Sequence, residues 1–160
     1  MSYFMMYRLK YCTFVLLLVL TGCTGEELTR DSKMNKRIIQ TSGAPAPIGP
    51  YSQAVAAGNM LFISGQIAID PATQEYVPGT PAQEAERAML NIKAILDEAG
   101  TDFGHVIKTT IFLRDMAHFA DVNQVYARFF TQDFPARETV AVAGLPKNAM
   151  VEISMTVLIP

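Results

Sequence analysis

The sequence predicts an α+β domain in which one mixed β-sheet carries two helices on one face. Two observations lead to this prediction. Segments rich in β-branched residues alternate with two helical segments in the order β-β-β-α-β-α-β-β, and the last strand alternates apolar with semi-polar residues. A helix between strands implies a crossover and parallel neighbours, whereas a hairpin implies antiparallel neighbours. With 160 residues, the chain is long enough for one such domain and a short appendage.

Three strands are expected before the first helix. They are residues 37–40, 53–57 and 60–66. The last two flank Gly58 and Asn59, a pair that is typical of hairpin turns. Segments 42–50 and 70–79 contain prolines and glycines and are therefore expected to be loops.

The first helix is predicted to begin after Thr80 and to end at Gly100. Thr80 and Gln83 can form a capping box, and Pro81 suits the first helical position because its missing N–H costs nothing there. Glycine is the usual residue at a helix C-terminus. Apolar residues recur between these ends with the helical period. They are Ala85, Ala88, Met89, Ile92, Ile95, Leu96 and Ala99.

The second half of the domain is expected to contain a strand, a helix and two more strands. Residues 106–113 are rich in β-branched side chains and predict the first of these strands. Asp115 is the expected N-cap of the helix, which should end before Pro135. Its apolar stripe consists of Phe119, Val122, Tyr126, Phe129 and Phe130. The remaining strands are residues 139–142 and 151–159.

The last strand alternates two kinds of side chain. One set is apolar and should face the helices: Val151, Ile153, Met155, Val157 and Ile159. The other set is neither a core nor an ordinary charged surface: Glu152, Ser154, Thr156 and Leu158. A sheet face of this character often packs against copies of itself, so a homo-oligomer is expected.

Composition excludes several classes of site. The chain has 13 Lys and Arg against 15 Asp and Glu, a formal net charge of −2, without a basic run, so a nucleic-acid partner is not expected. Its two cysteines are too few for a disulfide scaffold or an iron–sulfur site. His105 and His118 stand alone and lack metal-ligand spacing, and no nucleotide-binding fingerprint is present. Neither a metal nor another cofactor is expected.

The N-terminal segment differs from the rest of the chain. Two basic residues precede the short apolar run 14–20, and small residues lead to Cys23, a pattern that resembles a bacterial lipoprotein signal. This resemblance implies a signal peptide over residues 1–22, a lipidated Cys23 with a flexible tether to residue 35, and a domain over 36–160. Because Thr24 follows the cysteine, an outer-membrane anchor in the periplasm is expected. The alternative is translation from Met34, which would leave a cytoplasmic protein.

Three local patterns are candidates for chemistry. They are residues 49–52, residues 63–66, and residues 134–137 together with Glu152. The planar guanidinium of Arg137 is suited to bind a small carboxylate through two parallel hydrogen bonds. Each residue taken alone has an ordinary interpretation: Arg137 and Glu152 as surface or ion-pair residues, and Ser64 and Gly65 as a turn.

Taken together, several segments resemble the RidA (YjgF) family of enamine and imine deaminases. The segments are residues 46–54, 58–66, 106–115, 122–126, 134–137, 145–147 and 151–153, and the likeness extends over residues 36–160. The resemblance implies a chorismate-mutase-like fold and a homotrimer with an active site at each subunit interface. It implies hydrolysis of 2-iminobutanoate, 2-iminopropanoate or their enamines to 2-keto acids and ammonia, without a cofactor.

The resemblance also implies roles for individual residues. Arg137 would bind the substrate carboxylate, and Glu152 would position and activate the attacking water. The pocket would be lined by Tyr51, Ser64, Gly65 and Asn123. Thr139, where many relatives have cysteine, and a short loop over residues 130–134 leave the substrate range open. Two alternative functions are a trimeric module that binds small carboxylates with little turnover and a ribonuclease, which the acidic composition disfavours.

Overall fold

A computed structural model describes residues 36–159 of the chain. The predicted signal peptide, the tether and the lipidation site Cys23 lie outside these residues. No helix in the described part combines the length and the apolar character needed to cross a membrane.

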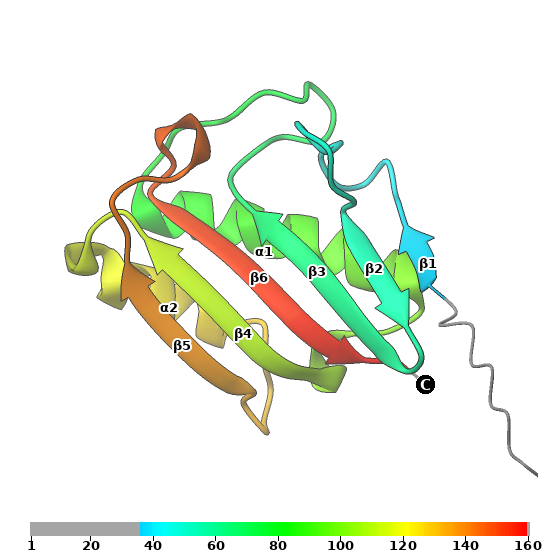
Figure 1. Cartoon of the computed structure of the whole chain (residues 1–160). Coiled ribbons are helices and arrows are strands. Elements are labelled where there is room, and N and C mark those ends of the chain that lie inside the picture. Colours follow the sequence, from blue (N-terminus) through cyan, green and yellow to red (C-terminus); the bar gives the residue numbers. More distant parts are fainter. Residues whose placement is uncertain (1–35, 160) are drawn as a thin grey trace, which may run out of the picture. The chain divides into compact units, whose positions relative to one another are not determined.

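Six strands form one mixed sheet in the order β1-β2-β3-β6-β4-β5 (Figure 1). The strands are β1 (Lys36–Ile39), β2 (Ala54–Ala57), β3 (Met60–Gln66), β4 (Val106–Leu113), β5 (Ala136–Ala141) and β6 (Val151–Leu158). Only β4 and β5 pair in parallel, and α2 lies between them in the chain. The other neighbours are antiparallel, including the predicted hairpin of β2 and β3. The predicted order of elements is therefore confirmed.

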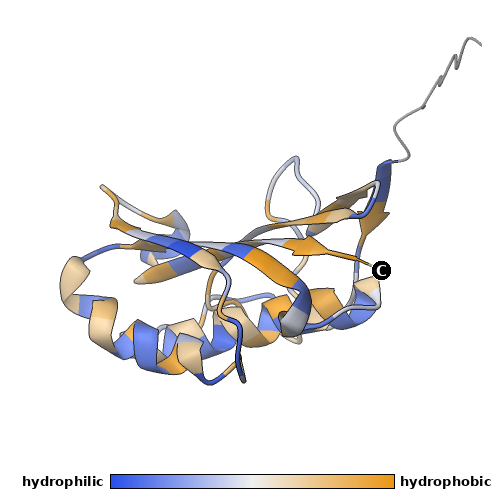
Figure 2. Cartoon of the chain, turned by 90° about the horizontal axis from the view of Figure 1, so that it is seen from below, coloured by the Kyte–Doolittle hydropathy of each residue, from blue (hydrophilic) through white to orange (hydrophobic). Residues whose placement is uncertain are grey.

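Both helices lie on the same face of the sheet (Figure 2). Helix α1 (Pro81–Ala99) has the predicted capping box between Thr80 and Gln83, and it ends at Gly100, whose φ of 76° is left-handed. Helix α2 (Phe119–Ala127) is shorter than its apolar stripe suggested. Asp115 caps a 3-10 turn ahead of α2 instead of the α-helix itself, because its carboxylate accepts from the Ala117 N–H.

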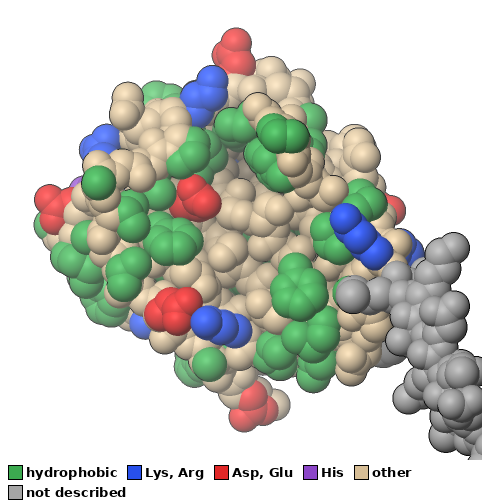
Figure 3. Space-filling model, viewed as in Figure 1, with side chains coloured by type: hydrophobic (Ala, Val, Ile, Leu, Met, Phe, Trp, Pro, Cys, Tyr) green, Lys and Arg blue, Asp and Glu red, His purple; other side chains and the backbone are tan. Residues whose placement is uncertain are grey.

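The alternation along β6 divides the sheet into two faces, as predicted. Val151, Ile153, Met155 and Val157 are buried against the helices, whereas Glu152, Ser154 and Thr156 are partly exposed and Leu158 is exposed. Figure 3 shows the uncovered face: uncharged polar side chains and backbone occupy its middle, and apolar side chains gather around them. Phe62 and Val140 are among the exposed apolar side chains in register with this set.

The predicted strand 139–142 begins too late. Strand β5 starts at Ala136 and pairs in parallel with β4 from Lys108↔Ala136 to Leu113↔Ala141. Its first residues carry no apolar alternation because β5 is an edge strand that is exposed along most of its length. Arg137 consequently lies inside the strand and has a defined side of the sheet.

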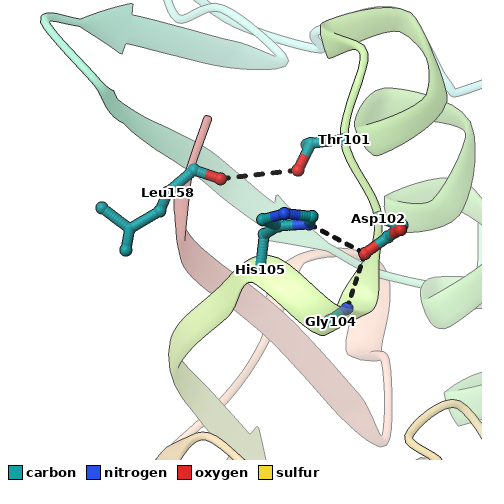
Figure 4. A network of polar contacts seen from close by, with 5 residues as sticks. All are labelled: Thr101, Asp102, Gly104, His105 and Leu158. Carbon is teal, nitrogen blue, oxygen red and sulfur yellow. Dashed lines mark hydrogen bonds and ion pairs between the residues drawn. The ribbon is translucent and has the colours of Figure 1, made fainter. Parts of the chain in front are cut away.

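The crossover from α1 to β4 is fixed by a small polar network (Figure 4). Asp102 accepts from the Gly104 N–H and contacts His105 Nδ1 at 3.0 Å, while the Thr101 hydroxyl donates to the Leu158 carbonyl. The hydrogen bond from His105 is the main reason that the pKa of Asp102 lies below its usual range. This exposed histidine therefore supports the Asp102 carboxylate, which caps the turn.

Candidate active site

A cavity of about 440 Å³ opens beside Glu152. The loop between β1 and β2, the end of β3 and the start of β6 form its walls. Its lining is Pro45, Ala46, Ile48, Tyr51, Gln53, Ser64, Gly65, Gln66, Ile67, Ile69, Pro146 and Glu152. A mainly apolar lining with a few convergent polar groups is characteristic of small-molecule sites.

Glu152 lies half-buried on β6 with its carboxylate against Gly65. A Cβ added at Gly65 would lie 2.7 Å from the Glu152 carboxyl carbon, so only glycine leaves room for this side chain. Burial raises the pKa of the Glu152 carboxyl above its usual range. Within residues 36–159 the carboxylate has neither a hydrogen-bond donor nor an ion-pair partner. The carboxylate is therefore not used in a hydrogen bond or ion pair of the fold and is available to accept a proton.

The polar side chains around Glu152 hold the cavity walls in place. The Ser64 hydroxyl donates to the Ser52 carbonyl at 2.6 Å, and the Tyr51 hydroxyl accepts from the Ile48 N–H at 3.2 Å. Gln53 is 2% exposed; its amide nitrogen donates to three loop carbonyls, and its oxygen accepts from the Thr41 N–H. The sequence predicts Gln53 only as the first residue of a strand. A polar residue at the core-facing end of that strand is the one signal of its role.

Arg137 lies in a different environment. Its guanidinium donates to the Asn123 amide oxygen at 2.8 Å and lies 4.9 Å from the centre of the Tyr126 ring. Phe119 flanks it at 5.8 Å. These contacts orient the guanidinium beside a hollow of about 370 Å³ that Phe134 also lines. The two aromatic residues of α2 were expected as core positions, but they also support the arginine through cation–π contacts.

One chain does not bring Arg137 and Glu152 together. The register places Arg137 beside Thr109 and Met155 on the helix-covered face. It places Glu152 beside Phe112 and Val140 on the uncovered face. The structure therefore groups the predicted site residues into two half-sites. The Glu152 half-site contains Tyr51, Ser64, Gly65 and Glu152, and the Arg137 half-site contains Asn123 and Arg137.

Residues 36–159 contain no group of three or more His, Cys, Asp or Glu side chains placed to hold a metal ion. Thr139 follows Arg137 by two residues on the same face of β5. Its buried hydroxyl has no hydrogen-bond partner among residues 36–159. The arrangement offers charge and hydrogen bonds: a cation for an anionic substrate in one half-site and a proton acceptor in the other.

Comparison with known proteins gives consistent matches across the domain. The sequence model of the endoribonuclease L-PSP family matches residues 41–159. The chain is 49% identical over 122 residues to the 2-iminobutanoate/2-iminopropanoate deaminase of Bos taurus, a match that covers 76% of this chain and 89% of the relative. It is 53% identical over 123 residues to protein DfrA of Myxococcus xanthus, covering 76% and 94% of the two chains.

Solved structures have the same fold. The E. coli YjgF gene product has a TM-score of 0.73 at 46% identity, over 76% of this chain and 98% of the other. E. coli TdcF with bound serine has a TM-score of 0.74 at 41% identity, over 78% and 99%. The matched residues span both half-sites. The chain therefore belongs to the endoribonuclease L-PSP family, the RidA (YjgF) group that its sequence motifs resemble.

Proposed function

We propose that this protein is a hydrolytic deaminase of 2-imino acids such as 2-iminobutanoate and 2-iminopropanoate, or their enamines, and that it acts as a homotrimer. The observation that carries the proposal is the separation of the half-sites. One half-site has a cation but no free carboxylate, and the other has a free carboxylate but no cation. At an interface between two copies, both groups could contact one substrate. Relatives named for this activity, at 49% identity, support the proposal.

Arg137 binds the substrate carboxylate in this mechanism. Its guanidinium forms two parallel hydrogen bonds to the carboxylate, which fixes the orientation of the adjacent C=N bond. Asn123 and Tyr126 keep the guanidinium in one orientation before substrate arrives. The substrate therefore binds without first having to order the arginine.

Glu152 of the neighbouring copy acts as the general base. It takes a proton from water while the water oxygen bonds to the imine carbon, and it passes this proton to the imine nitrogen, which gives a carbinolamine. It then takes the proton of the new hydroxyl group and transfers it to the amino nitrogen as the C–N bond breaks, so that ammonia leaves and a keto group remains. A carboxyl pKa raised by burial favours this exchange of protons near neutral pH. An imine is a reactive electrophile, so positioning and proton transfer suffice.

A second candidate function is a binding module for small carboxylates. One relative was solved with bound serine, an amino acid with a carboxylate that an arginine can hold. Such a module needs Arg137 but not Glu152. The matching family is described as an endoribonuclease, so cleavage of RNA is a third activity to test, although the chain has more acidic than basic residues.

The decisive experiment measures keto-acid release from enzymatically generated 2-iminobutanoate by the full chain. We expect Arg137→Ala and Glu152→Gln each to lower kcat/KM by about 10²-fold or more. The matched controls Arg128→Ala and Glu98→Gln, at exposed positions on the helical side, should retain full activity.

Three outcomes would overturn the proposal or part of it. Binding of 2-ketobutanoate by calorimetry, with no turnover by wild type and no effect of Glu152→Gln, identifies a binding module. Cleavage of RNA that survives both substitutions identifies a nuclease. Retained keto-acid release in Arg137→Ala removes the arginine from the mechanism.

We propose further that the protein is lipid-anchored in the bacterial periplasm through Cys23. The support is the signal-like segment that precedes this cysteine. Metabolic labelling with palmitate should mark wild type and Cys12→Ser but not Cys23→Ser. Unlabelled protein that starts near Met34 would make it cytoplasmic.

A further inference from the structure

Helix α1 carries a carboxylate that the proposed mechanism does not use. Glu84 is 1% exposed, although it lies in the first turn of the helix. One of its oxygens accepts from the Tyr76 hydroxyl at 2.5 Å, and the other accepts from the Met150 N–H at 2.8 Å. Burying a carboxylate is costly, and oriented donors offset only part of that cost. An apolar residue would be the simpler choice if packing were the only requirement.

The two donors belong to segments that form the Glu152 half-site. Tyr76 lies in the loop ahead of α1 and forms a β-bridge with Ile69, which lines the cavity. Met150 directly precedes β6, two residues before Glu152. The Glu84 carboxylate therefore joins the cavity wall to the strand that carries the proposed general base.

The same end of β6 is held from its other side by Arg114. The Arg114 backbone N–H donates to the Met150 carbonyl, and its guanidinium donates to the Asn148 carbonyl, both at 2.9 Å. Lys147 and Asn148, which follow Pro146 of the cavity, have φ values of 58° and 56°. Asparagine adopts this left-handed region readily, but a lysine there is uncommon and costs free energy that surrounding contacts must offset. The backbone entering β6 therefore depends on contacts from both sides.

We infer that Glu84 is a positioning residue: its buried carboxylate sets the start of β6, and thereby the position of Glu152 against Gly65 in the cavity. The expected loss in kcat rests on the proposed function, whereas the expected displacement of Glu152 does not. Glu84 is not among the residues that line the cavity, and its two hydrogen bonds go to Met150 and Tyr76, so we infer that it acts through them.

Substitutions at Glu84 separate positioning from packing. Glu84→Ala leaves the Met150 N–H and the Tyr76 hydroxyl without partners, and kcat should fall by about 10-fold to 10²-fold with KM little changed. Glu84→Gln should restore most of the activity, because its amide oxygen can accept from Met150 while its amide nitrogen donates to the Tyr76 oxygen. Ile95→Ala, a core truncation on the same helix, should lower Tm but preserve kcat below the melting range.

A second measurement does not depend on turnover. The pKa of Glu152 can be followed by carbon-13 NMR of its side-chain carboxyl, assigned by the signal that Glu152→Gln removes. It should fall toward the ordinary value in Glu84→Ala, as the carboxylate moves into water, and stay raised in Glu84→Gln and Ile95→Ala.

A folded Glu84→Ala with wild-type kcat and an unchanged Glu152 pKa overturns the inference, even if the proposed deaminase activity is confirmed. An inactive wild type overturns the proposed function and leaves the NMR comparison to decide the inference. If Glu84→Ala does not fold, Tyr76→Phe decides in its place: a loss in kcat of several-fold supports the inference, and an unchanged kcat and Glu152 pKa refute it.

Discussion

The two half-sites are built in opposite ways. The Glu152 half-site lies on strands in the interior of the sheet, where Gly65, Gln53 and Glu84 fix its walls, and its carboxylate has no partner among residues 36–159. The Arg137 half-site lies on edge strand β5, and its guanidinium already has Asn123 and Tyr126 as partners. The carboxylate thus lies half-buried among interior strands without a partner, whereas the guanidinium is exposed and held by side chains.

If the proposed function holds, this difference shows how work is divided between the copies. A reactive carboxylate must be kept from neutralisation within its own chain, and the sheet separates it from the chain's own Arg137. A carboxylate-binding arginine must reach another copy, and an edge strand lets it do so. The predictions below test this division, from the largest expected effect to the smallest.

Mixed oligomers provide the largest effect. Arg137→Ala and Glu152→Gln should each be inactive alone, but co-refolded at equal amounts they should recover about one quarter of wild-type activity, because in a cyclic assembly about one site in four receives both intact groups. The measurement is imine hydrolysis after mass spectrometry has verified subunit exchange.

The control for this experiment mixes Arg137→Ala with a chain that carries both substitutions. No site can then contain an intact arginine, so activity should stay at the background level. Exchange without recovery in the first mixture would show that Arg137 of one copy and Glu152 of another do not form a shared site.

Gly65→Ala should give an intermediate effect on the Glu152 half-site. The added methyl occupies the space of the Glu152 carboxylate, so the side chain must turn away and kcat should fall by about 10-fold or more. Gly144→Ala is the matched control, since a Cβ there meets no atom within 4 Å. Equal activity of the two variants in the imine assay would contradict the placement of Glu152.

The smallest expected effect is on stability: Glu152→Gln should change how the free energy of unfolding depends on pH. Burial raises the pKa of Glu152 in the folded state, so its contribution to stability is complete below the unfolded-state pKa and is lost as pH rises through the folded-state pKa. The variant should therefore gain stability relative to wild type near neutral pH and lose this advantage at about pH 4. Solvent screening limits the gain to less than about 1 kcal/mol.

Thermal melts at the two pH values check this prediction. A variant that is less stable than wild type near neutral pH would mean that a cation already pairs with Glu152. The Glu152 carboxylate would then already have an ion-pair partner in the folded protein.

The fold could be predicted from the sequence where burial is periodic. The alternation along β6 assigned its two faces, and the Thr80–Gln83 capping box located the start of α1. The start of β5 could not be found, because an edge strand exposed on both faces has no apolar alternation. For the same reason the face that Arg137 occupies could not be read from its neighbours in sequence.

The candidate residues were predictable from motifs, but their grouping was not. Nothing in the order of residues says that Asn123 contacts Arg137, since a crossover brings α2 beside β5. Glu84 was missed because an acidic residue in the first turn of a helix is ordinarily explained by the helix dipole. Its burial depends on Tyr76 and Met150, which lie far from it in sequence or in a loop of unpredictable course.

The position of β1 has a practical consequence for protein engineering. The chain enters the six-stranded sheet at one edge, while Arg137 lies on the strand at the opposite edge. A reporter or an affinity handle joined ahead of Lys36 therefore starts from the border most remote from the cationic group. Immobilising the domain by that end should leave substrate access and subunit exchange open to measurement on a sensor surface.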